Sequence, residues 1–167
     1  KDYKVVPWCP RCGTTLSTHE LAQGYKDVKD LSLYVKFKVS PASHEATQDT
    51  PTYLLAWTTT PWTLPGNVGL AVGEKIDYVK IKKENEILIL AESRLKMVEG
   101  EYEIIEKIKG QDLVGLEYEP LYPFIKKDDK AFRVYPADFV NTEDGTGIVH
   151  TAVMYGQDDF ELGTKVG

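Results

Sequence analysis

Short apolar or alternating segments, separated by turn-forming residues, recur along most of the chain. Residues 33–39 alternate apolar and polar side chains with period two, which is typical of a half-buried strand. Residues 53–57 form a nearly continuous apolar run, which indicates a buried strand. Further strands are predicted over residues 68–72, 78–81, 87–90, 102–108, 132–135 and 148–151.

Only two segments have the pattern of a helix. Residues 92–98 place Leu95 and Val98 three positions apart, and a second helix begins near Gly156, where Asp158 can serve as the N-cap. Because short strands outnumber helices and the turns between them resemble antiparallel connections, the pattern predicts a mainly β fold. The expected architecture is a closed or nearly closed six-stranded β-barrel with small peripheral helices.

The chain divides into a short N-terminal part and one globular domain. Residues 1–24 contain a Cys-x-x-Cys turn and a polar stretch, and we interpret them as a linker or half of a small zinc knuckle. Residues 25–167 are expected to form a single domain, since their length suffices for one core. The absence of an initial methionine and the helical pattern at the C-terminus suggest a piece excised from a larger protein.

Composition narrows the classes of function. The 20 basic and 26 acidic residues give a net charge of −6, and the lysines alternate with acids, which argues against broad binding to a phosphate backbone. No apolar run of about 18 residues and no basic-then-apolar leader is present, so neither a membrane span nor a signal peptide is predicted. We expect a cytoplasmic protein, whose two cysteines suit metal or redox chemistry better than a disulfide.

The segment 56–67 concentrates threonines around two prolines and ends in an asparagine. Threonine suits the end of a strand, while Pro61 and Pro65 fix φ and remove backbone donors, so neither helix nor central strand is expected to continue here. Such a segment is either a solvated turn or a rigid polar surface that faces a ligand.

A second cluster favours the ligand surface. Residues 144–152 read Asp-Gly-Thr-Gly-Ile-Val-His-Thr-Ala, and Gly-Gln-Asp-Asp-Phe follows at 156–160. Together with the Thr-Thr-Thr-Pro-Trp-Thr run at 58–63, these motifs resemble the editing domain of isoleucyl-tRNA synthetase, a module inserted in a class I synthetase. The resemblance covers nearly the whole chain. Valyl enzymes typically have Arg-Pro-Glu within the first motif and lysine in place of His150, so the isoleucyl type fits better.

The resemblance implies an activity and a substrate. Such domains hydrolyse mischarged valyl-tRNA, so the expected partners are the 3′ end of tRNA(Ile) carrying valine and the remainder of the synthetase, with the isolated domain a monomer. Two alternatives stay open. One is a non-catalytic barrel that docks tRNA or a partner, and the other is the editing domain of a valyl enzyme acting on threonyl-tRNA(Val), which His150 disfavours.

The resemblance also implies roles for individual residues. Asp159 would pair with the ammonium of the esterified amino acid, although an acidic residue at a helix start more often caps the helix. His150 would form the pocket wall that tells valine from isoleucine, although a lone histidine on an apolar strand is more often a core residue. The remaining expected substrate contacts are Trp57, Thr58, Thr59, Thr60 and Thr63. Trp57 and Trp62 would stack on the terminal adenine or wall it off.

Direct attack by water is the expected chemistry, because no Gly-x-Ser-x-Gly elbow is present. Asn67 would hold the water or the ester through its amide, with Thr60, His150 and Asp159 completing the catalytic set. Many relatives have proline where this chain has Val153, so the wall that Met154 and Tyr155 form is left undefined.

No cofactor is expected for editing. Cys9 and Cys12 have the spacing of half a structural zinc site, which needs two further ligands. The resemblance implies that these ligands lie elsewhere in the intact enzyme.

Overall fold

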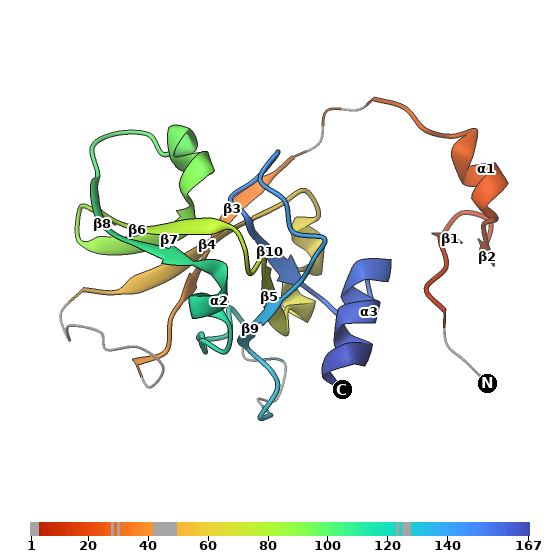
Figure 1. The fold of residues 1–167 in the computed structure, drawn as a ribbon. Helices are drawn as coiled ribbons and strands as arrows, with labels where there is room; N and C mark the ends of the chain where they lie inside the picture. The colour runs from red at the N-terminus through yellow and green to blue at the C-terminus, as the bar shows by residue number, and fades with distance from the viewer. Residues whose placement is uncertain (1–3, 28, 30, 42–49, 123, 125–127) are drawn as a thin grey trace.

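The computed structural model describes residues 4–27, 29, 31–41, 50–122, 124 and 128–167. Its main sheet contains eight strands (Figure 1). They are β3 (Leu33–Lys38), β4 (Thr52–Thr58), β5 (Gly69–Val72), β6 (Asp77–Lys83), β7 (Glu86–Ala91), β8 (Glu103–Lys109), β9 (Arg133–Pro136) and β10 (Ile148–Thr151). Every predicted strand is therefore present, with bounds that shift by one or two residues.

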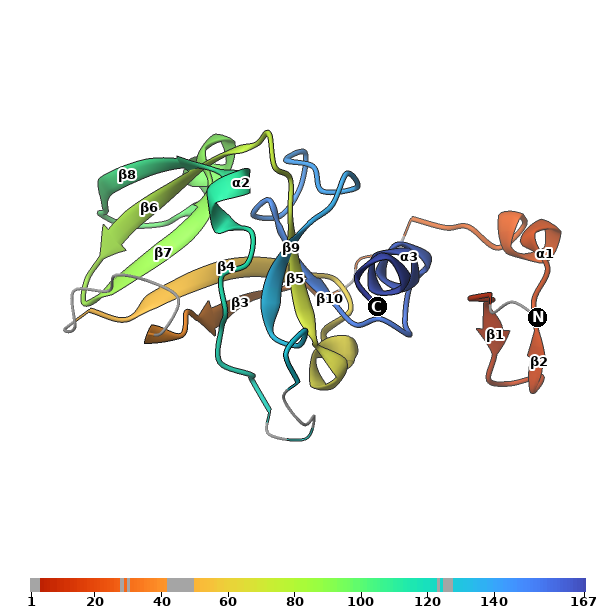
Figure 2. The same cartoon turned by 60° about the horizontal axis from the view of Figure 1, so that its bottom comes forward.

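The central strand of the sheet is β4. Its residues 53–58 pair with β3, while its first residues also pair with β7 and Trp57 pairs with Val149 of β10. The order along the sheet is β8-β6-β7-β4-β10-β5-β9. The two halves of the sheet thus diverge from β4, as Figure 2 shows.

The expectation of antiparallel connections holds for only part of the sheet. The pairs β3–β4, β5–β10, β6–β7 and β6–β8 are antiparallel, but β4–β7, β4–β10 and β5–β9 are parallel. A mixed sheet requires long connections between its parallel neighbours. The segments 59–85, 59–147 and 73–132 supply them for β4–β7, β4–β10 and β5–β9.

The predicted closed six-stranded barrel is not confirmed. The sheet has eight strands, and its end strands β8 and β9 do not pair with each other in the part of the chain that the structure describes. From β9, two isolated bridges lead back to the end of β3: Glu117 pairs with Arg133, and Tyr118 pairs with Val39. The sheet is therefore curled but open.

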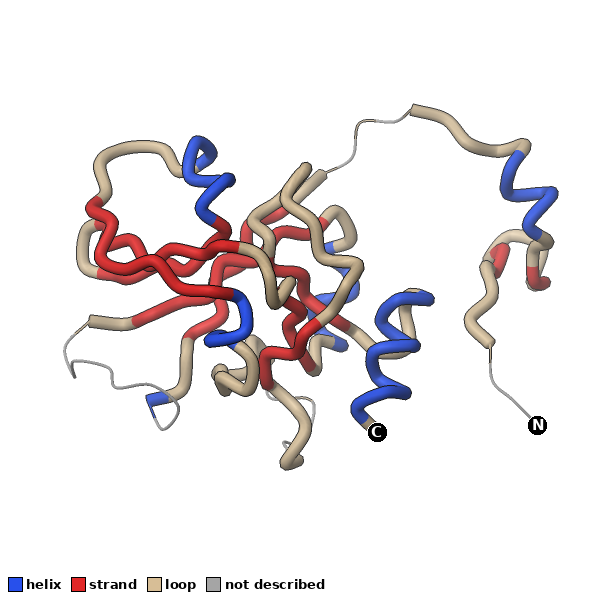
Figure 3. The backbone as a smooth tube through the Cα atoms, in the orientation of Figure 1, coloured by secondary structure: helices blue, strands red, loops and turns tan. Residues whose placement is uncertain are grey.

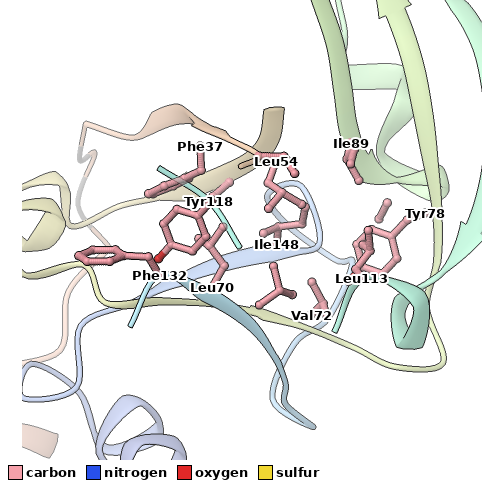
Figure 4. Close-up of a cluster of buried hydrophobic side chains, with 14 of the residues drawn as sticks. Phe37, Leu54, Leu70, Val72, Tyr78, Ile89, Leu113, Tyr118, Phe132 and Ile148 are labelled. Atoms are coloured by element: carbon pink, nitrogen blue, oxygen red, sulfur yellow. The ribbon is translucent and has the colours of Figure 1, made fainter. Parts of the chain in front are cut away.

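The core lies inside this curl. Tyr118 packs edge-on against Phe37 and Phe132, with ring centroids 5.2 and 6.0 Å away. Figure 4 shows these rings beside Leu70, with Tyr78 at the other end of the same cluster. Burial of such large side chains supplies most of the stability of the fold, at about 25 cal/mol per Å² of apolar surface.

Short helices cover the sheet, as expected, but one prediction about them is wrong. The segment 92–98 contains a 3₁₀ helix, η3 (Glu92–Met97), and the Thr/Pro segment, which was not expected to be helical, contains another, η2 (Pro61–Gly66). Pro61 occupies the first position of η2, where the missing backbone donor costs nothing. After β3, the described chain has two α-helices, α2 (Gly110–Leu113) and α3 (Gln157–Val166).

The N-terminal residues form a small unit of their own. It comprises a hairpin of β1 (Trp8–Cys9) and β2 (Thr14–Thr15), followed by α1 (Thr18–Ala22). The views in Figures 1 and 3 show this unit apart from the main sheet. The predicted loop at 40–51 lies mostly outside the described residues. Within the described part of the chain, no helix is both long and apolar enough for a membrane.

Candidate functional site

The threonines of the first motif lie where β4 ends and η2 begins. Thr58 is the last residue of β4 and is buried, and its hydroxyl accepts the Thr60 N–H at 3.0 Å. The hydroxyl of Thr63 donates to the Thr60 carbonyl at 2.7 Å and lies 3.3 Å from the Thr60 hydroxyl. These local bonds turn the chain out of the strand and fix a row of hydroxyls on one surface.

His150 faces this row from β10. Its Nε2 lies 2.8 Å from Thr63 Oγ1, and the residue is only 7% exposed. Burial lowers the pKa of His150 to about 4, because the charged imidazolium loses its hydration there. The ring is therefore neutral near pH 7.

Asp159 approaches from the first turn of α3. Burial raises its pKa, and the Ala152 N–H, 3.4 Å from Asp159 Oδ2, opposes that rise. The predicted N-cap role of Asp158 is wrong: the N-cap is Gly156, no side chain caps this helix, and Asp158 is exposed. No ion pair among the described residues includes Asp159. A half-buried carboxylate of this kind suits a cationic ligand.

These side chains line one cavity of about 390 Å³. Its lining residues are Trp57, Thr58, Thr59, Thr60, Trp62, Thr63, Val149, His150, Tyr155 and Asp159. The structure thus brings together β4, η2, β10 and α3, and with them every expected substrate contact. The cavity offers hydroxyls, one neutral imidazole and one carboxylate to a small ligand.

Asn67 is the exception among the expected catalytic residues. It is 4% exposed and does not line the cavity. Its Nδ2 donates to the Gly69 carbonyl at 2.9 Å, and its Oδ1 accepts the Tyr118 hydroxyl at 2.7 Å. Asn67 therefore lies behind His150, and its role as a holder of water stays a prediction.

Trp57 is held in place from outside the cavity. A Cβ on Gly145 would lie 2.8 Å from the Trp57 ring, and the φ of Gly145 is +66°, so this position requires glycine. Arg94 of η3 fixes the loop by donating to the carbonyls of Glu143 and Gly145, both at 2.8 Å. Gly145 of the second motif thus allows that motif to pack closely against Trp57 of the first motif.

Two aromatic rings form the rim of the cavity. Trp62 and Tyr155 are each 67% exposed and both belong to the lining. Tyr155 packs over Gly66, where a Cβ would lie 2.7 Å from its ring. Of the two residues whose place the sequence left undefined, Tyr155 lines the cavity and Met154 does not.

Sequence reasoning missed one lining residue, Val149. Val149 pairs with Trp57 across two parallel strands and therefore lies beside that ring. The pairing itself could not be foreseen, since parallel neighbours were not expected.

The cysteines form a turn that suits half of a metal site. Gly13 N–H donates to the Cys9 carbonyl at 2.9 Å, and Cys12 N–H lies 3.3 Å from Cys9 Sγ. The Cys12 N–H, followed by the Cys12 side chain and the Arg11 N–H, lowers the pKa of the Cys9 thiol, which favours the thiolate that metals bind. Among the described residues no third ligand joins the pair, so the fit to a tetrahedral zinc ion is half complete.

Comparisons with known proteins agree on one family. No protein-family model matches the chain. Isoleucine–tRNA ligase of Clostridium tetani is 55% identical over 100% of the chain, which spans 16% of that protein. The corresponding enzyme of the archaeon Picrophilus torridus is 50% identical over 99% of the chain, which spans 15% of its length. The chain therefore matches one segment of much longer proteins.

Solved structures share the fold of this segment. The crystal structure of GlLeuRS-CP1 has a TM-score of 0.68 and 21% identity, with 81% of this chain and 60% of that chain covered. The P. falciparum cytosolic leucyl-tRNA synthetase editing domain has a TM-score of 0.60 and 19% identity, with 77% and 63% covered. The chain is a segment of the isoleucyl-tRNA synthetase type, and its fold is that of these editing domains. The ligase activity in the names of its sequence relatives is that of the whole enzymes.

Proposed function

We propose that this editing domain hydrolyses the ester bond of valyl-tRNA(Ile) by attack of a positioned water. The observation that carries the proposal is the single cavity in which the threonine row, His150 and Asp159 meet. An aminoacyl ester presents an ammonium group, a small side chain and a ribose, and the cavity has a matching group for each.

Asp159 is the proposed anchor for the ammonium. It is the one carboxylate among the lining residues, and no described salt bridge engages it. Its raised pKa reflects a carboxylate that has lost water without gaining a cation. An ammonium at this position would restore the missing partner through a charge-assisted hydrogen bond.

His150 is the proposed wall against isoleucine. It is buried and its ring is fixed on Thr63, so it can exclude a larger side chain by its volume. One methylene is worth about 1–3 kcal/mol in a pocket, an estimate whose standard example is isoleucyl-tRNA synthetase itself. A first site cannot reject valine well enough, and a second site that admits only the smaller residue completes the selection.

The threonines and the aromatic rim suit the terminal nucleoside. Thr59 and Thr60 are exposed within the lining and can bond to ribose hydroxyls or to the attacking water. Trp62 on the rim offers a flat face for a base, and such stacking is worth about 1–3 kcal/mol.

With this function the domain would act on the 3′ end of tRNA(Ile) as a monomeric module of a cytoplasmic synthetase. The remainder of the enzyme would supply most of the tRNA affinity, since the net charge of this chain is −6. It would also supply the two ligands that the Cys9–Cys12 turn lacks for a structural zinc ion.

The test is to incubate the domain with valyl-tRNA(Ile), isoleucyl-tRNA(Ile) and threonyl-tRNA(Val) and to follow the loss of each ester. The proposal predicts hydrolysis of the first substrate well above the uncatalysed rate. Preference for threonyl-tRNA(Val) would assign the domain to the valyl type, and binding of tRNA without hydrolysis of any ester would make it a docking module.

A further inference from the structure

Tyr118 is buried in the core, yet its hydroxyl is directed toward the site. The residue is 1% exposed, lies among Phe37, Leu70 and Phe132 (Figure 4), and donates to Asn67 Oδ1 at 2.7 Å. Burial raises the pKa of Tyr118, so the hydroxyl keeps its proton and remains a donor. Nothing in the proposed hydrolysis uses this bond.

The bond fixes the orientation of the Asn67 amide. Asn67 Nδ2 faces two carbonyl oxygens, that of Gly69 at 2.9 Å and that of Thr151 at 3.4 Å. Carbonyls only accept, so the NH₂ group must point toward them and Oδ1 must point toward the donor, Tyr118. The reversed amide would set acceptor against acceptor at a buried position, where an unpaired polar group is destabilising.

The oriented amide then acts on His150. Its Nδ2 lies 3.5 Å from His150 Nδ1, so a donor faces that ring nitrogen. A neutral imidazole carries one proton, and with Nδ1 as acceptor the proton is on Nε2. His150 Nε2–H can then donate to Thr63 Oγ1 at 2.8 Å, while Thr63 donates its own proton to the Thr60 carbonyl.

The other tautomer breaks this chain of bonds. With the proton on Nδ1, the ring would present a donor to the Asn67 NH₂ group. Thr63 would also have to donate to Nε2, and its bond to the Thr60 carbonyl at 2.7 Å would be lost. Only the Nε2–H form gives each donor an acceptor.

We propose that Tyr118 and Asn67 are positioning residues that hold His150 in the Nε2–H tautomer. His150 thereby serves as a fixed wall and a donor to Thr63, and it is not the general base that deprotonates the attacking water. The assignment of the tautomer stands on hydrogen bonds alone. Its consequence for selectivity rests on the proposed function.

The test compares two buried tyrosines that each lose one hydroxyl. Tyr118→Phe removes the donor to Asn67. Tyr78→Phe is the matched control, because Tyr78 is 0% exposed and its hydroxyl donates to the Gly147 carbonyl at 2.6 Å, in a different part of the core. Thermal unfolding verifies that each variant is folded.

The first readout is the ¹⁵N spectrum of the His150 ring in the free domain, assigned with His150→Gln. We expect one tautomer, Nε2–H, in the wild-type protein and in Tyr78→Phe, and a mixture of tautomers or exchange broadening in Tyr118→Phe. An Nδ1–H tautomer in the wild-type protein would overturn the proposal even if Tyr118→Phe failed to fold. An unchanged tautomer in folded Tyr118→Phe would also overturn it.

The second readout is hydrolysis of valyl-tRNA(Ile) and isoleucyl-tRNA(Ile). We expect the preference for valyl-tRNA to fall about tenfold in Tyr118→Phe, within the range that a small displacement in an active site can cause, and to stay unchanged in Tyr78→Phe. An equal loss of this preference in both variants would mean that Tyr118 has only a structural role. Because the spectrum is recorded without substrate, failure of the proposed hydrolysis would leave the tautomer test intact.

Discussion

Thr63 Oγ1 and His150 Nε2 lie 2.8 Å apart, although 87 residues separate them in the chain. This bond connects η2 to β10 and so holds the row of threonines beside that strand. The distance between these two elements sets the width of the cavity between them.

Replacing His150 by alanine widens the cavity and should relax its selectivity. We expect isoleucyl-tRNA(Ile) to become a substrate, with a relative gain of about 10- to 200-fold, the value of one methylene in a pocket. Both substrates are assayed with one enzyme preparation, and His19→Ala, an exposed histidine of α1, is the control. Equal loss of both activities would mean that His150 positions the ester or the water, and no change would make it an ordinary core residue.

The buried imidazole should also make the domain sensitive to acid. The folded pKa of His150 is about 4 and its ordinary value is 6.5, so the unfolded chain binds the proton more tightly. Stability contributed by the neutral ring is complete above pH 6.5 and is lost as the pH falls toward 4, by at most about 3 kcal/mol.

Urea unfolding at pH 7 and pH 5 measures this effect, with His150→Gln as the variant that cannot titrate. The wild-type protein should lose more stability than the variant over this interval. Subtracting the two removes the contribution of Asp159, whose raised pKa acts in the opposite direction by favouring the folded state in acid. An equal loss in both proteins would contradict the lowered pKa.

Gly145 should tolerate no side chain. Alanine at this position would carry a positive φ and would press against Trp57, whereas alanine at Gly115 would carry a positive φ with no heavy atom within 4 Å. Both substitutions cost about 1–2 kcal/mol for the left-handed backbone. Gly145→Ala should cost a further 1–3 kcal/mol or so for overpacking and should slow hydrolysis by displacing Trp57. Equal unfolding free energies for the two variants would exclude this contact.

Serine at both Cys9 and Cys12 should leave hydrolysis of valyl-tRNA unchanged. Neither residue lines the cavity, and the hairpin that carries them lies apart from the main sheet (Figure 1). The assay compares the double variant with the wild-type domain at equal folded concentration. A folded double variant without activity would favour thiol or metal chemistry over attack by water.

The sequence predicted local structure better than closure of the sheet. Alternation and apolar runs located every strand of the main sheet, because the side-chain pattern along a strand depends only on neighbouring residues. They did not locate the short β1 and β2. The parallel pairing of β4 with β7 and β10 depends on contacts between distant segments, which no local pattern reports. Closure of the barrel depends on the same long-range pairing, and the structure does not confirm the closed barrel that we expected.

The same distinction applies to the site. The two motifs located the cavity, since most of its lining residues belong to them. The position of Asn67 behind His150 could not be predicted, because it follows from the 3₁₀ turn of η2 and from the distant Tyr118. The prolines were taken to exclude a helix, yet proline is accepted at the first position of a helical turn.

The most direct measurement is the rate of valyl-tRNA(Ile) hydrolysis by Asp159→Ala beside Asp158→Ala. Both substitutions remove one negative charge from the first turn of α3, but only Asp159 lines the cavity. Loss of a charge-assisted hydrogen bond of about 1.5–3 kcal/mol should slow Asp159→Ala by about 10- to 150-fold. Asp158→Ala should keep the wild-type rate and lose no more than about 1 kcal/mol of stability through the helix dipole. A wild-type rate in folded Asp159→Ala, or the larger loss in Asp158→Ala, would contradict the assignment of Asp159 as the anchor of the substrate ammonium.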